Sequence, residues 1–133
     1  MSKCIFCDIV KGSVSSYKIY EDENSLCFLD VKPISRGHCL IIPKSHYENI
    51  YDIDENSLKQ IIIIAKKVSK LLKKKLGADG VNILHASGET AQQSVLHFHL
   101  HLIPRYKSDD LDAWPKSTYQ EKSLKGTFKR INE

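Results

Sequence analysis

The feature that most constrains the fold of this chain is the stretch HFHLHLIP, which runs from His97 to Pro104. Three of the six histidines stand here at alternate positions, with phenylalanine and leucine between them. Alternation with a period of two is typical of a β-strand, whose successive side chains point to opposite faces of a sheet. The stretch therefore predicts a strand that directs three imidazoles toward a site and its hydrocarbon side chains toward a core.

Short apolar segments on both sides of this stretch predict an antiparallel sheet. YKIYED, SLCFLD and GHCLIIP precede a long helical pattern, and GVNILHAS follows it. Between residues 54 and 76 apolar residues recur at helical intervals, and Gly77 is placed to end the helix. The N-terminal CIFCDIVKG predicts one or two helical turns. The expected class is α+β, with an antiparallel sheet of about five strands, one long helix and a short N-terminal helix.

Length and charge limit the number of domains and the kinds of partner. A chain of 133 residues suits one domain over residues 1–133, and its polar tail, residues 106–133, has no clear pattern. Lys and Arg total 20 against 16 Asp and Glu, a net charge of +4. This modest excess suits small anions and falls short of the concentrated basic surface of a nucleic-acid binder. We therefore expect no nucleic-acid partner.

The chain also lacks the patterns of membrane insertion and export. No apolar run has the length of a membrane span, and MSKCIFCDIVKG lacks the layout of a signal peptide. We therefore expect a cytoplasmic protein without a membrane partner. In that reducing compartment the four cysteines are expected to be thiols or metal ligands, with Cys27 and Cys39 in the core.

Three imidazoles on one face of a strand favour chemistry over a structural role, because burying three polar rings side by side is costly. Two chemistries fit: all three bind a metal, or one is a nucleophile and the others assist it. The adjacent loop SGETAQQS offers hydroxyls and amides, whereas a site for a hard metal is expected to bring carboxylates. The loop favours a nucleophilic site for an anionic substrate.

These residues carry a family resemblance. HFHLHLIP resembles the motif of the histidine triad (HIT) superfamily, and FLDVKPISRGHCLIIPKSH and GETAQQSVLHFHLHLIPR resemble its central strand pair and its active-site loop and strand. The resemblance covers about residues 4–105. The chain is identified as a member of the HIT superfamily, in its bacterial-type, Hint-like branch.

The resemblance implies a hydrolase that cleaves nucleoside 5'-phosphoramidates or dinucleoside polyphosphates and releases an AMP-type purine nucleotide. His99 would attack the phosphorus to form a covalent nucleotidyl-histidine, and His101 would assist proton transfer. The alternative is a nucleotide-binding or partner-binding regulatory module with incidental turnover.

The resemblance also implies which residues hold the substrate. Gln93 and Ser94 would donate hydrogen bonds to the phosphate without a Mg²⁺ requirement, His38 would support the triad, and Asp30 would lie near the ribose hydroxyls. There is one departure. Ala86 stands where many relatives carry asparagine and cannot replace the hydrogen bonds of that amide.

The N-terminal Cys4-x-x-Cys7 is a candidate metal site. Alone, this motif fits a pair of buried thiols as well as it fits a pair of metal ligands. With His46 and His97 it would make a closed tetrahedral zinc site, and bacterial-type HIT proteins are similar in this arrangement. Such zinc would be structural, because four protein ligands leave no open position; free thiols are the alternative.

The long helix predicts an assembly. Ile61, Ile62, Ile63 and Ile64 are consecutive, and at 100° per residue they span most of a turn, so one sheet cannot bury them all. We expect Ile63 and Ile64 to meet a second copy in a homodimer, an assembly that the resemblance to Hint-like proteins also implies. The segment around Trp114 would then approach the partner's nucleotide pocket. In the alternative, the tail folds back over Ile63 or Ile64 in a monomer.

Overall fold

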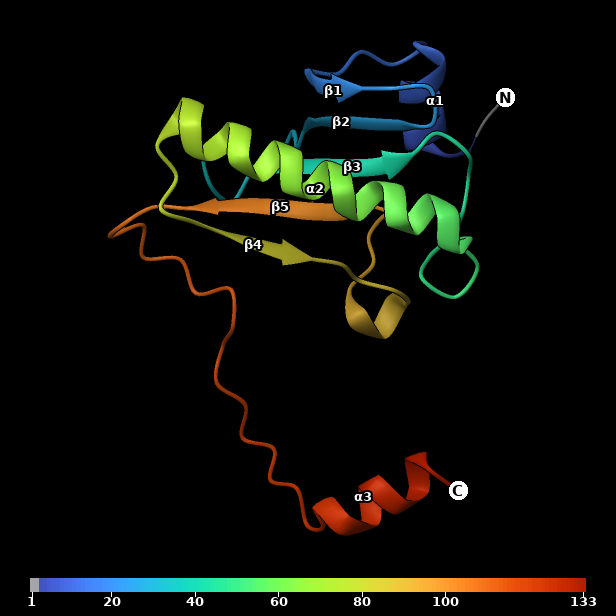
Figure 1. Cartoon of the computed structure of the whole chain (residues 1–133), viewed down its shortest axis with the longest axis vertical. Coiled ribbons are helices and arrows are strands. Elements are labelled where there is room, and N and C mark those ends of the chain that lie inside the picture. Colours follow the sequence, from blue (N-terminus) through green and yellow to red (C-terminus); the bar gives the residue numbers. More distant parts are fainter. Residues whose placement is uncertain (1–2) are drawn as a thin grey trace.

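The computed structural model describes residues 3–133 as a sheet with helices on both faces (Figure 1). The helices are α1 (Ile5–Lys11), α2 (Glu55–Leu76) and α3 (Leu124–Ile131), with one short 3-10 turn, η1 (Glu89–Ala91). The strands are β1 (Lys18–Glu21), β2 (Ser25–Leu29), β3 (Cys39–Pro43), β4 (Gly80–Leu84) and β5 (Leu100–Arg105).

The five strands form one antiparallel sheet in the order β1-β2-β3-β5-β4. The long helix α2 crosses one face, and α1 lies behind the other face near β1 and β2 (Figure 1). The predicted α+β class and its five-stranded antiparallel sheet are confirmed. Because β5 lies between β3 and β4, the histidine-bearing segment enters the sheet at an interior position.

Alternation along the strands divides the apolar side chains between two cores. Ile41 and Leu102 face α2 and are packed in one cluster with Val68. Leu40, which directly precedes Ile41 in β3, faces the other way and is packed in a second cluster with Phe6 of α1. The two clusters hold the sheet between α2 and α1, so side chains that alternate with Leu102 along β5 face α1.

Side chains cap the starts of both predicted helices, and the expected glycine ends the longer one. Asp54 precedes α2, and its carboxylate accepts the N–H of Ser57 at 3.3 Å. Gly77 ends the helix with a φ of 70°, a left-handed conformation that favours glycine. Cys4 caps α1 by accepting the N–H of Cys7 through its sulfur at 3.4 Å. Among residues 3–133, no helix has the length and apolar character needed to cross a bilayer.

The histidine strand is shorter than predicted. β5 begins at Leu100, so His97 and His99 precede the regular strand. The reason is that the N–H of Phe98 donates to the carbonyl of Tyr47, which lies in a loop, at 2.6 Å. The ladder with β3 consequently starts only where Ile41 faces Leu100.

The isoleucine run is divided differently from the prediction. Ile64 is buried against the sheet at 3% exposure, whereas Ile62 and Ile63 are exposed at 53% and 54%. The prediction that Ile64 would be left for another surface is wrong, because the sheet lies on the side of α2 that carries Ile61 and Ile64. The pair available to another surface is Ile62 and Ile63.

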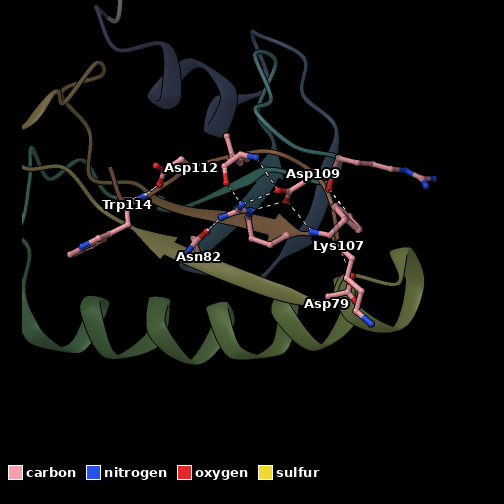
Figure 2. A network of polar contacts seen from close by, with 10 residues as sticks. Asp79, Asn82, Lys107, Asp109, Asp112 and Trp114 are labelled. Carbon is pink, nitrogen blue, oxygen red and sulfur yellow. Dashed lines mark hydrogen bonds and ion pairs between the residues drawn. The ribbon is translucent and has the colours of Figure 1, made fainter. Parts of the chain in front are cut away.

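A polar network fixes the start of the C-terminal segment beside β4 (Figure 2). The Arg105 guanidinium donates to both carboxylate oxygens of Asp109, at 2.8 and 2.9 Å, and to the side-chain carbonyl of Asn82 at 2.9 Å. The backbone N–H of Lys107 donates to Asp79 at 2.9 Å. Beyond this network the chain runs away from the sheet to α3, which lies apart from α2 (Figure 1).

Candidate active site

A pocket of about 440 Å³ lies between α1, the end of β2 and the residues that lead into β5. Four of the residues predicted to act on substrate line it: Asp30, Ser94, His99 and His101. Its walls are mostly apolar side chains of α1 and β2, among them Phe6 and Phe28. An apolar pocket with a few convergent polar groups is typical of a small-molecule site.

His99 presents an unprotonated nitrogen in this pocket. Its Nδ1 lies 2.7 Å from the carbonyl oxygen of His97. Because a carbonyl can only accept, Nδ1 carries the hydrogen, and in a neutral imidazole Nε2 then holds the lone pair. The ring is 3% exposed and makes an edge contact with Phe6 at 5.2 Å between centroids. This geometry leaves Nε2 as the free nucleophilic atom.

His101 has the opposite arrangement, which a chain of hydrogen bonds through His38 sets. The N–H of Ile34 donates to Nδ1 of His38 at 3.2 Å, so His38 carries its hydrogen on Nε2. That Nε2 lies 2.9 Å from Nδ1 of His101 and 3.5 Å from the carboxylate of Asp30. His101 therefore accepts at Nδ1 and keeps a hydrogen on Nε2.

Burial keeps these imidazoles neutral. Removal from water lowers the pKa of His38 and of His99 below their usual value. Burial, followed by the neighbouring His99 and His38, lowers the pKa of His101 to about 4. At neutral pH the site thus holds neutral rings, which is the state that a nitrogen nucleophile requires.

The two predicted phosphate donors differ in position. Ser94 is exposed and lines the pocket. Gln93 is buried, and its amide nitrogen donates to the carbonyls of Glu48 at 2.6 Å and Val95 at 3.0 Å, while its oxygen accepts the N–H of Gly88 at 2.8 Å. With both amide hydrogens engaged, Gln93 holds the loop in place, and Ser94 is the residue placed to meet a phosphate.

The four predicted metal ligands come together at the N-terminal end of the histidine segment. Their ligand atoms, the sulfurs of Cys4 and Cys7 and Nδ1 of His46 and His97, all lie within 4.8 Å of one another. Nε2 of His97 donates to the carbonyl of Pro43 at 2.8 Å, so its Nδ1 lone pair faces the sulfurs.

The spacing of these atoms fits tetrahedral zinc. With Zn–N near 2.0–2.1 Å and Zn–S near 2.3 Å, neighbouring ligand atoms should lie about 3.3 Å apart for N and N, and about 3.6 Å for N and S. The distance from His46 Nδ1 to His97 Nδ1 is 3.1 Å, and the S to N distances are 3.4, 3.4 and 3.6 Å. The donor set and its geometry therefore suit zinc.

A second group of possible ligands, Asp30, His38 and His101, does not suit a metal equally well. A metal would need the lone pair of His38 on Nε2. The N–H of Ile34 already places that lone pair on Nδ1. We therefore interpret this group as a hydrogen-bonded relay that sets the protonation of His101.

The structure adds one polar pair to the site that the sequence analysis did not assign. His85 hydrogen bonds to the backbone of His99, and Ser87 hydrogen bonds to His85. The sequence holds only a weak signal for this pair: a histidine and a serine flank Ala86, the position that departs from the family pattern.

Comparison with known proteins decides the family. Residues 11–108 match the family model described as the HIT domain. The protein belongs to the HIT family. A crystal structure of a HIT family member from Bacillus subtilis is 38% identical, with a TM-score of 0.88 over 98% of this chain and 96% of that one.

Two further relatives bear on chemistry. This HIT protein is 41% identical to the Adenosine 5'-monophosphoramidase HNT1 of Saccharomyces cerevisiae over 84% of this chain and 70% of that protein. It is 38% identical to a Zn-bound histidine triad family protein from Mycobacterium smegmatis, whose crystal structure has a TM-score of 0.81 and matches 84% of this chain and 81% of that one.

Proposed function

We propose that this HIT protein is a nucleotide hydrolase that cleaves nucleoside 5'-phosphoramidates or dinucleoside polyphosphates and releases a purine nucleoside monophosphate. The observation that carries the proposal is the pairing, in one pocket, of an Nε2 lone pair on His99 with an Nε2 hydrogen on His101. The phosphoramidase named among its relatives supports the same class of reaction.

In the proposed reaction, Nε2 of His99 forms a bond to the α-phosphorus while the bond from phosphorus to the leaving nitrogen or oxygen breaks. His101 donates its Nε2 hydrogen bond to the leaving atom and stabilises the charge that develops there. Water then attacks the nucleotidyl-histidine and restores His99; overall, water supplies the new oxygen on phosphorus and the proton on the leaving group. Two displacements with good leaving groups replace one difficult step.

We also propose roles in substrate binding for residues in and around the pocket. Ser94 donates to the phosphate, Asp30 lies at the pocket wall where a carboxylate can accept from ribose hydroxyls, and His38 sets the protonation of His101. Gln93 acts through the loop that it holds. Because the donors are protein groups, the reaction needs no Mg²⁺.

The test is release of AMP from adenosine 5'-phosphoramidate and from diadenosine tetraphosphate by the purified protein, without added divalent metal. The proposal expects turnover of at least one of the two. Tight AMP binding with no release from either substrate would overturn it in favour of a binding module.

We also propose that the cluster of Cys4, Cys7, His46 and His97 holds one structural zinc ion. Four protein ligands close the coordination shell, so the metal would fix the start of α1 to the histidine segment and take no part in the chemical step. Thiolate ligands of this kind suit a reducing compartment, which is consistent with a cytoplasmic location.

Finally, we propose that the protein is a homodimer. Ile62 on α2 is an exposed apolar side chain, and so are Val81 and Ile83 on β4, the strand whose outer edge is unpaired among the described residues. Pairing about a twofold axis would cover both. The C-terminal segment leaves the sheet beside β4, so its Trp114, which is 85% exposed, would be carried toward the partner's pocket.

A further inference from the structure

The ladder between β4 and β5 ends just before the nucleophile. Its last pair is Leu84 and His101, so continued pairing would bring Ala86 opposite His99. Instead, the side chain of His85 occupies this place, with Nδ1 2.9 Å from the carbonyl oxygen of His99. Because the carbonyl accepts, Nδ1 of His85 carries the hydrogen and donates it.

The second nitrogen of His85 completes an ordered chain of hydrogen bonds. Its Nε2 lies 2.5 Å from Oγ of Ser87 and, in the neutral ring, accepts the serine hydroxyl hydrogen. Oγ of Ser87 in turn accepts the backbone N–H of Ile50 at 2.9 Å. Every donor in this chain meets an acceptor, so the loop before α2 is joined through two side chains to the backbone of His99.

Packing also holds the His85 ring in place. The ring is stacked on Phe98, with centroids 4.3 Å apart and planes inclined by 21°. Phe98 belongs to the core under α2, on the opposite side of the chain from the pocket. His85 is absent from the described residues that line the pocket, so it lies behind His99 and does not reach the substrate.

We propose that His85 and Ser87 form a positioning pair that holds the His99 peptide and thereby aims Nε2 of His99 at the phosphorus. This rests on the proposed function, in which His99 is the nucleophile. His99 lies outside the regular strand, and its ring is tied at Nδ1 to the carbonyl of His97. A shift of its peptide would therefore move the ring, and a misplacement of about 1 Å can cost about a hundredfold in rate.

The pair also accounts for the departure at position 86. Alanine offers no side-chain hydrogen bond there, and the two residues that flank it supply bonds to the segment in its place. The nucleophile is thus held in position from the side of the sheet that faces α2, opposite the pocket.

Three substitutions separate hydrogen bonding from packing. His85→Phe keeps a ring to stack on Phe98 and removes both hydrogen bonds; His85→Asn keeps a donor near the place of Nδ1 and loses the stack; Ser87→Ala removes the link to Ile50. We expect His85→Phe to lower kcat about ten- to a hundredfold, with a KM within about threefold of the wild-type value. The kcat of His85→Asn should recover to within about fivefold of the wild type, and that of Ser87→Ala should lie between those of the other two variants.

Two results would overturn the positioning role in these assays. One is a wild-type kcat in His85→Phe. The other is a larger loss in His85→Asn, which lacks the stack on Phe98, than in His85→Phe, which keeps it; that order would indicate packing alone.

A spectroscopic measurement separates failure of this proposal from failure of the proposed function. In the NMR spectrum of protein labelled with ¹⁵N at histidine, His99 should show one protonated and one unprotonated ring nitrogen. The His99 signals are assigned as those that disappear in His99→Asn. We expect His85→Phe to shift or broaden the His99 signals and to leave those of His38 unchanged. If the wild type hydrolyses nothing, the proposed function fails while this comparison still stands; unchanged His99 signals in His85→Phe would overturn the positioning pair itself.

Discussion

His99 and His101 present opposite hydrogen-bonding states to the same pocket, with ring centroids 5.0 Å apart. A backbone carbonyl fixes the hydrogen of His99 on Nδ1, and His38 fixes that of His101 on Nε2. One ring is therefore an acceptor toward the pocket and the other a donor. Chemistry at phosphorus needs such a pair, because one bond must form while charge develops on the atom that leaves.

The acceptor ring should be indispensable. His99→Asn should abolish AMP release, because an amide nitrogen is not a nucleophile, and should leave AMP affinity within about tenfold, since Ser94 still faces the phosphate. Steady-state assays and calorimetric titration with AMP measure the two effects. Substantial turnover by this variant would remove His99 from its role.

The donor ring should matter according to the leaving group. His101→Ala should slow substrates with poor leaving groups by about a hundredfold or more and affect good leaving groups much less, because proton donation contributes most where charge accumulates. A series of adenosine 5'-phosphoramidates with amines of different basicity tests this. A uniform loss across the series would contradict the assignment.

Burial of His101 makes stability depend on pH in a defined window. The unfolded ring titrates near 6.5 and the folded ring at about 4, so between these values the unfolded state binds more protons. Stability should therefore fall as pH falls from 6.5 to 4, with a contribution from His101 of roughly 3 kcal/mol at about 1.4 kcal/mol per pH unit.

Urea unfolding of the wild type and of His101→Asn at several pH values measures this contribution. The variant should lose less stability than the wild type over the window, because it lacks the titrating ring of His101. Identical pH dependence in the two proteins would show that His101 is not shifted.

The Cys/His cluster should carry about one zinc ion per chain when the protein is purified without chelators. Cys4→Ser combined with Cys7→Ser should lose the metal and several degrees of melting temperature, yet retain activity. Cys27→Ala is the matched control, because that thiol lies in the core and should leave the metal content unchanged. Metal analysis that finds no zinc in the wild type would refute the site, as would a chemical step that strictly needs added zinc.

The exposed Ile62 of α2 should control assembly. Ile62→Glu should shift the protein from dimer to monomer at micromolar concentration, because an interface would bury a carboxylate without a partner. Tyr17→Glu, at an exposed position next to the other edge strand, should leave the mass unchanged. Light scattering measures the mass of the wild type and of both variants in solution. A wild-type mass near that of one chain would exclude the dimer.

Much of the fold followed from local patterns. The period of two in HFHLHLIP placed the imidazoles on one face, and Asp54 and Gly77 marked the ends of α2. The side of α2 that faces the sheet did not follow from these patterns. Successive residues differ by 100° around the helix, so only the packing of α2 on the sheet decides that Ile64 is buried and Ile63 exposed. The helix α3 was also missed, although Leu124, Phe128 and Ile131 recur at helical spacing, because a segment of 8 residues with a glycine inside it gives a weak local signal.

The candidate site divides in the same way. The residues that meet in the pocket and in the metal cluster were identified from spacing and resemblance. Their protonation was not, because it is decided by hydrogen bonds that residue spacing does not reveal. The carbonyl of His97 decides it for His99, and the carbonyl of Pro43, which lies 54 residues away, decides it for His97. The engagement of both Gln93 amide hydrogens within its own loop is a feature of the same kind.

Trapping the covalent intermediate tests the role of His99 as the nucleophile most directly. The protein is mixed with adenosine 5'-phosphoramidate, quenched within one turnover in alkaline denaturant, because nitrogen–phosphorus bonds are labile in acid, and mapped by peptide mass spectrometry. We expect an adenylyl group on His99 that disappears in His99→Asn. An adenylyl group on another residue, or AMP formed at the normal rate in His99→Asn, would contradict it.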